Sequence, residues 1–138
     1  MKWFDPLLAR HGGVLYTDEA YEHGDTQAML SWAVKRGTII RARRGVYCDP
    51  RLPARAIEAL RVGGRLACAS ALAHHGLAQE PRELHVVVPA NAARLRRLAE
   101  DVVVHWSRRR LAGDRVAVSV DEAVRQAARC RALVRDTL

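Results

Sequence analysis

The sequence is poor in several residue types, and each shortage narrows the range of functions. Lys2 and Lys35 are the only lysines among 23 lysine and arginine residues. A nuclease of the PDDEXK type needs a strand pair that presents Asp together with Glu-x-Lys, so the lack of lysine after Lys35 argues against one. Aromatic residues are also few, with three Trp, three Tyr and one Phe. We therefore expect a core built mostly from Leu, Val, Ala and Ile.

Cysteine is scarce as well. The three cysteines are widely spaced and form no C-x-x-C pair: Cys48, Cys68 and Cys130. This pattern favours a reducing cytosol and argues against both a disulfide framework and a zinc finger.

Histidines offer no evident metal motif. Adjacent histidines do not share a helix face, and no carboxylate or cysteine lies at ligand spacing from any of the candidates, which are His74, His75, His85 and His105. We predict helix capping and core packing for them, with no metal, no cofactor and no catalytic residue. Ser70 also lacks a G-x-S-x-G setting.

Long apolar runs are missing too. No stretch approaches the roughly 18–20 residues that span a bilayer, and the N-terminus has no signal-peptide core. We expect a cytoplasmic protein with no membrane partner.

Arginine is abundant, and it accounts for most of the net charge of +8. Its planar guanidinium binds phosphates and base edges bidentately, which favours a nucleic-acid partner. A GC-rich genome would also raise arginine at the expense of lysine.

The most informative stretch is Asp25 to Asp49. Asp25 is a candidate N-cap for a short helix that ends at Gly37. Met29, Leu30 and Ala33 would face inward, and we assign Trp32 to the core because aromatic side chains are usually buried.

Two β-prone runs follow this helix, Thr38–Ala42 and Val46–Cys48. Arg43, Arg44 and Gly45 separate them and supply a turn whose glycine tolerates a positive φ. A helix followed by a basic hairpin is typical of a winged helix, in which the helix enters the DNA major groove and the wing contacts the backbone or the minor groove.

Charge supports this interpretation. From Lys35 to Arg51 there are six cations and one anion, whereas residues 1–27 carry two cations and five anions. We predict contacts with double-stranded DNA from the polar helix face and the wing: Thr26, Gln27, Ser31, Lys35, Arg36, Arg41, Arg43, Arg44 and Tyr47. The alternative is that these polar residues are solvated and do not contact DNA. Winged helices also serve as protein-binding modules, so the fold alone does not require DNA.

The stretch 49–53 contains two prolines and is a plausible linker. Beyond it we expect helices at 54–62 and 66–75, a strand at 83–88, a helix at 92–100, strands at 102–106 and 116–118, and a helix from Asp121 to about Asp136 capped by Ser119. The predicted fold class is α+β, with a winged helix-turn-helix over residues 1–50 and a small α/β domain over 54–138.

A second basic group lies in the predicted C-terminal domain, at Arg94, Arg96, Arg97, Arg108, Arg109 and Arg110. It could extend the DNA footprint, meet an acidic partner or remain solvated, as charge runs usually do.

Several motifs together resemble the AbiEi-type antitoxins of type IV toxin–antitoxin systems. The most specific are the wing RRGVY at 43–47 and the helix end SALAHHGL at 70–77, with ELHVVVPA and VAVSVDEAVRQAAR further on. The resemblance implies an N-terminal DNA-binding domain that represses its own operon in phage defence, and a C-terminal domain that counters a nucleotidyltransferase-like toxin. The chain departs from the family at 119–123, and it is shorter than many relatives, which makes DNA binding the better supported of the two roles.

We therefore predict a transcriptional repressor that is not an enzyme. Two other interpretations stay open: a protein-interaction module that holds a toxin or other effector inactive, and a DNA-binding fragment of a longer effector. The residues define neither the oligomeric state nor the toxin partner.

Overall fold

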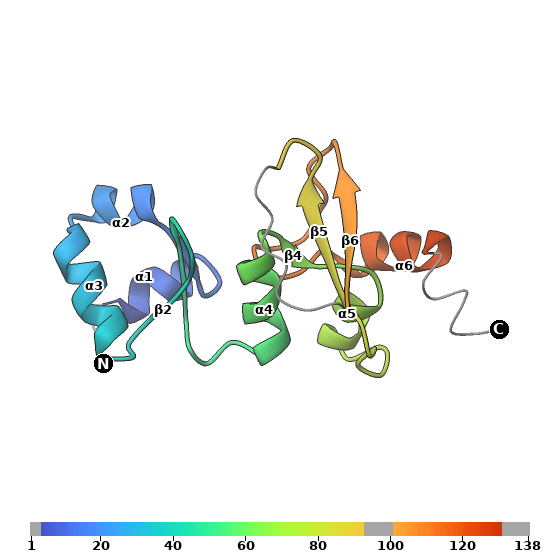
Figure 1. The fold of residues 1–138 in the computed structure, drawn as a ribbon, viewed down its shortest axis with the longest axis horizontal. Coiled ribbons are helices and arrows are strands. Elements are labelled where there is room, and N and C mark those ends of the chain that lie inside the picture. Colours follow the sequence, from blue (N-terminus) through green and yellow to red (C-terminus); the bar gives the residue numbers. More distant parts are fainter. Residues whose placement is uncertain (1–3, 93–100, 131–138) are drawn as a thin grey trace.

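The structure is a computed structural model that describes residues 4–92 and 101–130. It has an α+β fold, and its elements fall into two groups, each built around a three-stranded sheet (Figure 1). The predicted helix at 92–100 and the end of the predicted last helix, 131–136, lie outside the described residues. No helix in the described ranges is long and apolar enough to cross a membrane.

The first group has the element order and strand pairing of a winged helix-turn-helix. It comprises α1 (Asp5–Arg10), β1 (Val14–Tyr16), α2 (Thr17–His23), α3 (Gln27–Lys35), β2 (Ile40–Arg43) and β3 (Val46–Cys48). The antiparallel sheet has the order β1-β3-β2, so the central strand pairs Tyr47 with Leu15 on one side and with Arg41 on the other. Gly45 has φ +81° at the hairpin tip, the conformation predicted for the turn.

The helix starts differ in detail from the prediction. Thr26, not Asp25, caps α3, because its Oγ1 accepts the backbone N–H of Met29 at 3.2 Å. The Asp25 side chain is instead buried and its Oδ2 lies 3.0 Å from His23 Nδ1. At the start of α2, the carboxylate of Glu19 accepts the backbone N–H of Tyr16 at 2.9 Å.

The second group surrounds a mixed sheet of order β4-β5-β6. It contains α4 (Ala54–Val62), β4 (Arg65–Leu66), α5 (Cys68–His74), β5 (Leu84–Pro89), β6 (Val102–Ser107) and α6 (Val120–Arg129). Strands β5 and β6 are parallel, and β4 is antiparallel to β5. In Figure 1, α4 lies on one side of this sheet and α6 on the other.

Two sequence expectations for this group were wrong. The predicted helix 66–75 begins only at Cys68, because Leu66 pairs with Val86 in the sheet and its N–H donates to Val116. Residues 116–118 form only isolated bridges, from Ala117 to Leu66 and from Val118 to Gly113. Local composition predicted a helix for the first run and a strand for the second, but tertiary pairing decided the structure of both.

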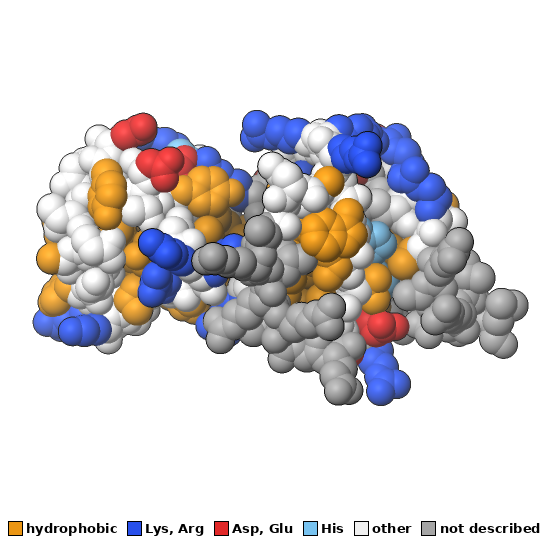
Figure 2. Space-filling model, turned by 45° about the horizontal axis from the view of Figure 1, so that its top comes forward, with side chains coloured by type: hydrophobic (Ala, Val, Ile, Leu, Met, Phe, Trp, Pro, Cys, Tyr) orange, Lys and Arg blue, Asp and Glu red, His pale blue; other side chains and the backbone are white. Residues whose placement is uncertain are grey.

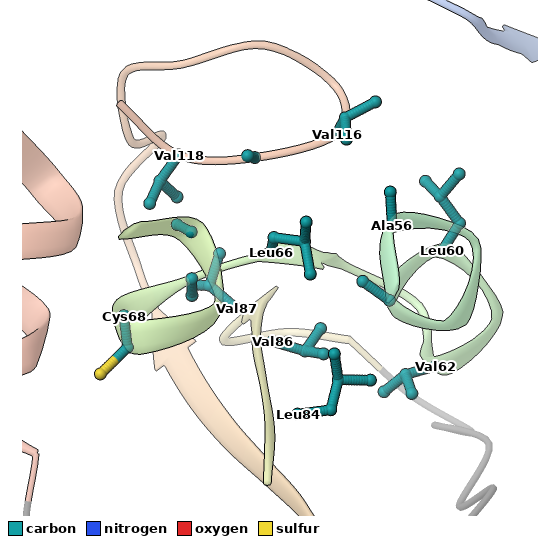
Figure 3. Close-up of a cluster of buried hydrophobic side chains, with 14 of the residues drawn as sticks. Ala56, Leu60, Val62, Leu66, Cys68, Leu84, Val86, Val87, Val116 and Val118 are labelled. Carbon is teal, nitrogen blue, oxygen red and sulfur yellow. The ribbon is translucent and has the colours of Figure 1, made fainter. Parts of the chain in front are cut away.

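The larger hydrophobic cluster joins the two sheets. Leu66 and Val86 lie near its centre, Val116 lies on the loop above them (Figure 3), and α4 packs Ala56 and Leu60 from one side. The same cluster includes three buried residues of the first sheet, Val14, Ala42 and Cys48. The packing therefore runs continuously across the proline-containing stretch 49–53.

A candidate nucleic-acid interface

Helix α3 presents a polar face to solvent. Leu30 and Ala33 are fully buried in the smaller hydrophobic cluster, beside Phe4, Leu15 and Tyr47, and they anchor the helix. The predicted contact residues of the opposite face are all exposed: Thr26, Gln27, Ser31, Lys35 and Arg36. Met29 is half-buried at the edge of the anchored face.

Two aromatic assignments were wrong. Trp32 is 46% exposed, since it lies about 200° around the helix from the buried Leu30. The guanidinium carbon of Arg36 lies 4.7 Å from the centre of its ring, so the pair forms part of the exposed face. Tyr47, predicted to contact DNA, is only 3% exposed, because it stands on the central strand and packs beneath the helices.

Gln27 keeps its amide nitrogen available. Its Oε1 accepts a hydrogen bond from the hydroxyl of Tyr21 at 3.0 Å, which orients the amide, and both side chains are exposed. A carbonyl oxygen has two lone pairs, so the amide can still make the bidentate contact that glutamine makes with adenine.

The wing opens onto a basic groove. Arg41 and Arg44 are exposed and Arg43 is half-buried. A groove of about 1300 Å³ lies between the wing and the second group of elements, and eight of the described arginines line it: Arg10, Arg43, Arg44, Arg65, Arg108, Arg109, Arg110 and Arg115. Figure 2 shows Lys and Arg side chains on both halves of the molecule, with a row along the upper edge of the C-terminal half.

Most of these arginines carry uncompensated charge. Among the described residues, no ion pair involves Arg10, Arg43, Arg44, Arg108 or Arg110, and Asp114 is the only acidic residue that lines the groove. Arg109 is different, since its Nη2 lies 3.6 Å from Glu122. A concave surface with one sign of charge focuses the electrostatic field and raises the local concentration of an oppositely charged partner.

Arg65 supports the loop that follows Arg108–Arg110. It donates to the carbonyl oxygens of Leu111 at 2.6 Å and Asp114 at 2.7 Å. Burial lowers the pKa of this guanidinium, but an arginine stays charged at any physiological pH. The other predicted basic residues, Arg94, Arg96 and Arg97, lie outside the described residues.

Arg115 bridges the two groups of elements. Its guanidinium donates to both carboxylate oxygens of Glu19 at 2.6 Å and to the carbonyl oxygen of Val14 at 3.1 Å. It also lies 4.4 Å from the centre of the Tyr16 ring. Nothing in the sequence pairs residues 19 and 115, so this contact was not predicted.

The ion pair between Arg115 and Glu19 makes the free energy of unfolding depend on pH. The hydrogen bonds from Arg115 are the main cause that lowers the pKa of Glu19 from its ordinary 4.5 to about 2. A lowered folded-state pKa contributes stability above pH 4.5, and this contribution is lost as the pH falls toward 2. Between pH 6 and pH 3, we expect the free energy of unfolding of the wild-type protein to fall by about 2 kcal/mol more than that of Glu19→Gln. Urea unfolding at the two pH values measures both changes.

Glu22→Gln is the matched control, because Glu22 is exposed on the same helix. It should follow the wild-type acid dependence. Equal acid sensitivity of the wild type and Glu19→Gln would contradict the ion pair.

A second cluster of functional side chains lies in the C-terminal half, and the sequence did not predict it. Cys68, His85, His105 and Cys130 bring one sulfur or nitrogen atom each to within 4.8 Å of one another. Burial lowers the pKa of His105 to about 4, so its ring is neutral at pH 7, and burial raises the pKa of Cys68 to about 12. The spacing rule missed the cluster because its members come from four separate elements.

The helices and strands of residues 5–48 are compatible with a winged helix-turn-helix, and a groove lined with arginines lies beside the hairpin. Residues 5–48, from α1 to the end of β3, match the family described as "Transcriptional regulator, AbiEi antitoxin". The match confirms the family resemblance for this part of the chain. No curated protein matches the sequence.

Proposed function

We propose that this protein is a sequence-specific DNA-binding repressor that regulates its own operon. The observation that carries the proposal is the exposed polar face of α3 beside a basic wing, within the segment that matches a transcriptional-regulator family. The role is one of binding rather than catalysis.

In this proposal, α3 reads bases in the major groove. Gln27 lies in the first turn and contacts the edge of an adenine, while Lys35 reaches a guanine or a phosphate from the last turn. Thr26 caps the helix, and the N–H groups of the first turn face a backbone phosphate.

In the same proposal, arginines of the wing and the groove contact the phosphate backbone of the DNA. Arg41 and Arg44 are exposed, and Arg44 shares the groove with Arg108 and Arg110. We infer that the duplex or its flanking strand runs from α3 over the wing toward these arginines. The second basic group then extends the footprint rather than remaining solvated.

Binding to the protein's own upstream DNA tests the proposal. We expect tight binding to that duplex and binding at least about 1000-fold weaker to a scrambled duplex of equal length, the usual lower range for specific sites. Gln27→Ala should weaken binding to the upstream DNA by about 10-fold or more and leave the scrambled duplex unaffected, because it removes a base contact worth about 1–3 kcal/mol. Fluorescence anisotropy at fixed salt measures both.

Gln79→Ala is the matched control, since Gln79 is exposed in a loop after α5. It should leave both affinities unchanged. If Gln27→Ala lowered the affinity for both duplexes equally, the result would contradict the proposal that α3 contacts bases.

A second candidate function is toxin inhibition, with DNA binding secondary. The family description names an antitoxin, and the described residues of the second group of elements expose three large apolar side chains: Leu77 at 62%, Trp106 at 55% and Val124 at 51%. The partner would be a cognate nucleotidyltransferase-like toxin. This alternative predicts only weak, salt-sensitive and sequence-blind DNA binding in the same assay.

A further inference from the structure

Four potential metal ligands converge from four elements of the second group. Cys68 begins α5, His85 lies in β5, His105 lies in β6, and Cys130 directly follows α6. His85 and Cys68 are fully buried, Cys130 is 6% exposed and His105 is half-buried. Figure 3 shows the Cys68 sulfur pointing away from the aliphatic cluster.

The strand register brings the two histidines together. His105 stands opposite Val87 in the parallel pair of β5 and β6, and Val87 lies on the same face of its strand as His85. His85 Nδ1 and His105 Nε2 are 3.2 Å apart. The Cys130 sulfur lies 3.8 Å from the first nitrogen and 4.0 Å from the second.

These distances are close to those of a tetrahedral zinc site. With Zn–N bonds of about 2.0–2.1 Å and Zn–S bonds of about 2.3 Å, tetrahedral angles put two ligand nitrogens about 3.3 Å apart and a sulfur about 3.6 Å from a nitrogen. The separations among His85, His105 and Cys130 therefore need adjustments of only a few tenths of an ångström, and the Cys68 sulfur lies within 4.8 Å of all three atoms. A hydrogen bond between the two rings would account for their distance, but not for two thiols that converge on the same point.

Two polar side chains position the ligands. Gln126 of α6 is buried and accepts the backbone N–H of Cys68 at 2.9 Å, while Ser70 accepts that of His85, also at 2.9 Å. Cys68 has φ +51°, the only positive φ of a non-glycine residue in the described part of the chain. A side chain held in this disfavoured conformation marks a position that the surrounding structure has constrained.

We propose that Cys68, His85, His105 and Cys130 bind one Zn²⁺ ion as a structural site. Two thiolates and two imidazoles suit zinc, and four protein ligands leave no open position for a substrate. The ion would link the start of α5 and the end of α6 to the two parallel strands. This inference is independent of the proposed DNA binding.

Cobalt provides a direct probe of the full-length chain after metal removal in reducing buffer. We expect one equivalent of Co²⁺ to give the strong visible absorption of a tetrahedral site and a near-ultraviolet thiolate-to-metal band, and one equivalent of Zn²⁺ to abolish both. Cys68→Ser and Cys130→Ser should each remove much of the thiolate band and weaken zinc binding by more than about 100-fold, beyond the effect of changing a residue that only supports a ligand.

The chain supplies matched controls. Cys48 is buried but outside the cluster, and His74 is exposed, so Cys48→Ser and His74→Gln should keep the wild-type cobalt spectrum and affinity. A weak octahedral spectrum in the wild type would overturn the proposal, as would strong bands that survive in Cys68→Ser or that Cys48→Ser abolishes equally.

A second measurement needs no variant and holds even if the cysteine variants fail to fold. Zinc should protect Cys68 and Cys130 of the metal-depleted wild type from alkylation, mapped by mass spectrometry, and should raise its melting temperature where Mg²⁺ does not. Equal alkylation of both cysteines with and without zinc would refute the site.

Discussion

Replacing Arg115 with alanine is expected to lower the free energy of unfolding by about 3 kcal/mol. The change removes two hydrogen bonds to Glu19, one to Val14 and the contact with the Tyr16 ring. The Glu19 side chain is only 20% exposed, so its carboxylate would be left poorly solvated and without the guanidinium that pairs with it. Breaking such a pair costs far more than the pair contributes over an apolar replacement.

Urea unfolding at pH 7 measures this loss. Arg51→Ala is the control, because Arg51 is 76% exposed and its partner, Asp49, is a near neighbour in sequence, so we expect a much smaller loss than for Arg115→Ala. Glu19→Gln combined with Arg115→Ala should cost less than the sum of the two single changes. Additive losses, or a loss from Arg115→Ala no larger than that from Arg51→Ala, would show that the bridge contributes little.

The second large effect concerns the basic groove. Arg43→Ala/Arg44→Ala should weaken binding to operator and unrelated duplex alike and should flatten the plot of log affinity against log salt by about two units, near 0.9 per lost phosphate contact. We expect a similar change for Arg108→Ala/Arg110→Ala, because these side chains line the same groove. Combining all four changes should lower affinity at 0.1 M salt by at least about 100-fold.

The control variant also removes two positive charges, but outside the groove. Arg82 and Arg129 are exposed and do not line the groove, so Arg82→Ala/Arg129→Ala should leave the salt slope within about one unit of wild type. An unchanged salt slope for Arg43→Ala/Arg44→Ala would show that the wing does not contact DNA. An unchanged slope for the 108/110 variant alone would confine DNA to the winged helix.

The winged helix was largely predictable because its signals are local. Gly37 and Gly45 mark the end of α3 and the hairpin tip, and the β-prone runs at 38–42 and 46–48 mark strands β2 and β3. The exchange of roles between Trp32 and Tyr47 was not predictable. Burial tendency favours aromatics inside, but which of the two meets the core depends on the rotation of α3 and on the central position of β3.

Composition and spacing within a few residues were enough to predict the α+β class, the helix-and-hairpin order of residues 25–49 and the arginine-rich charge that points to a nucleic-acid partner. The folded arrangement was needed to reveal the shared groove, the Arg115–Glu19 bridge and the convergence of Cys68, His85, His105 and Cys130. These features join residues far apart in the chain, and their distances follow from sheet register and helix packing, which no local pattern encodes.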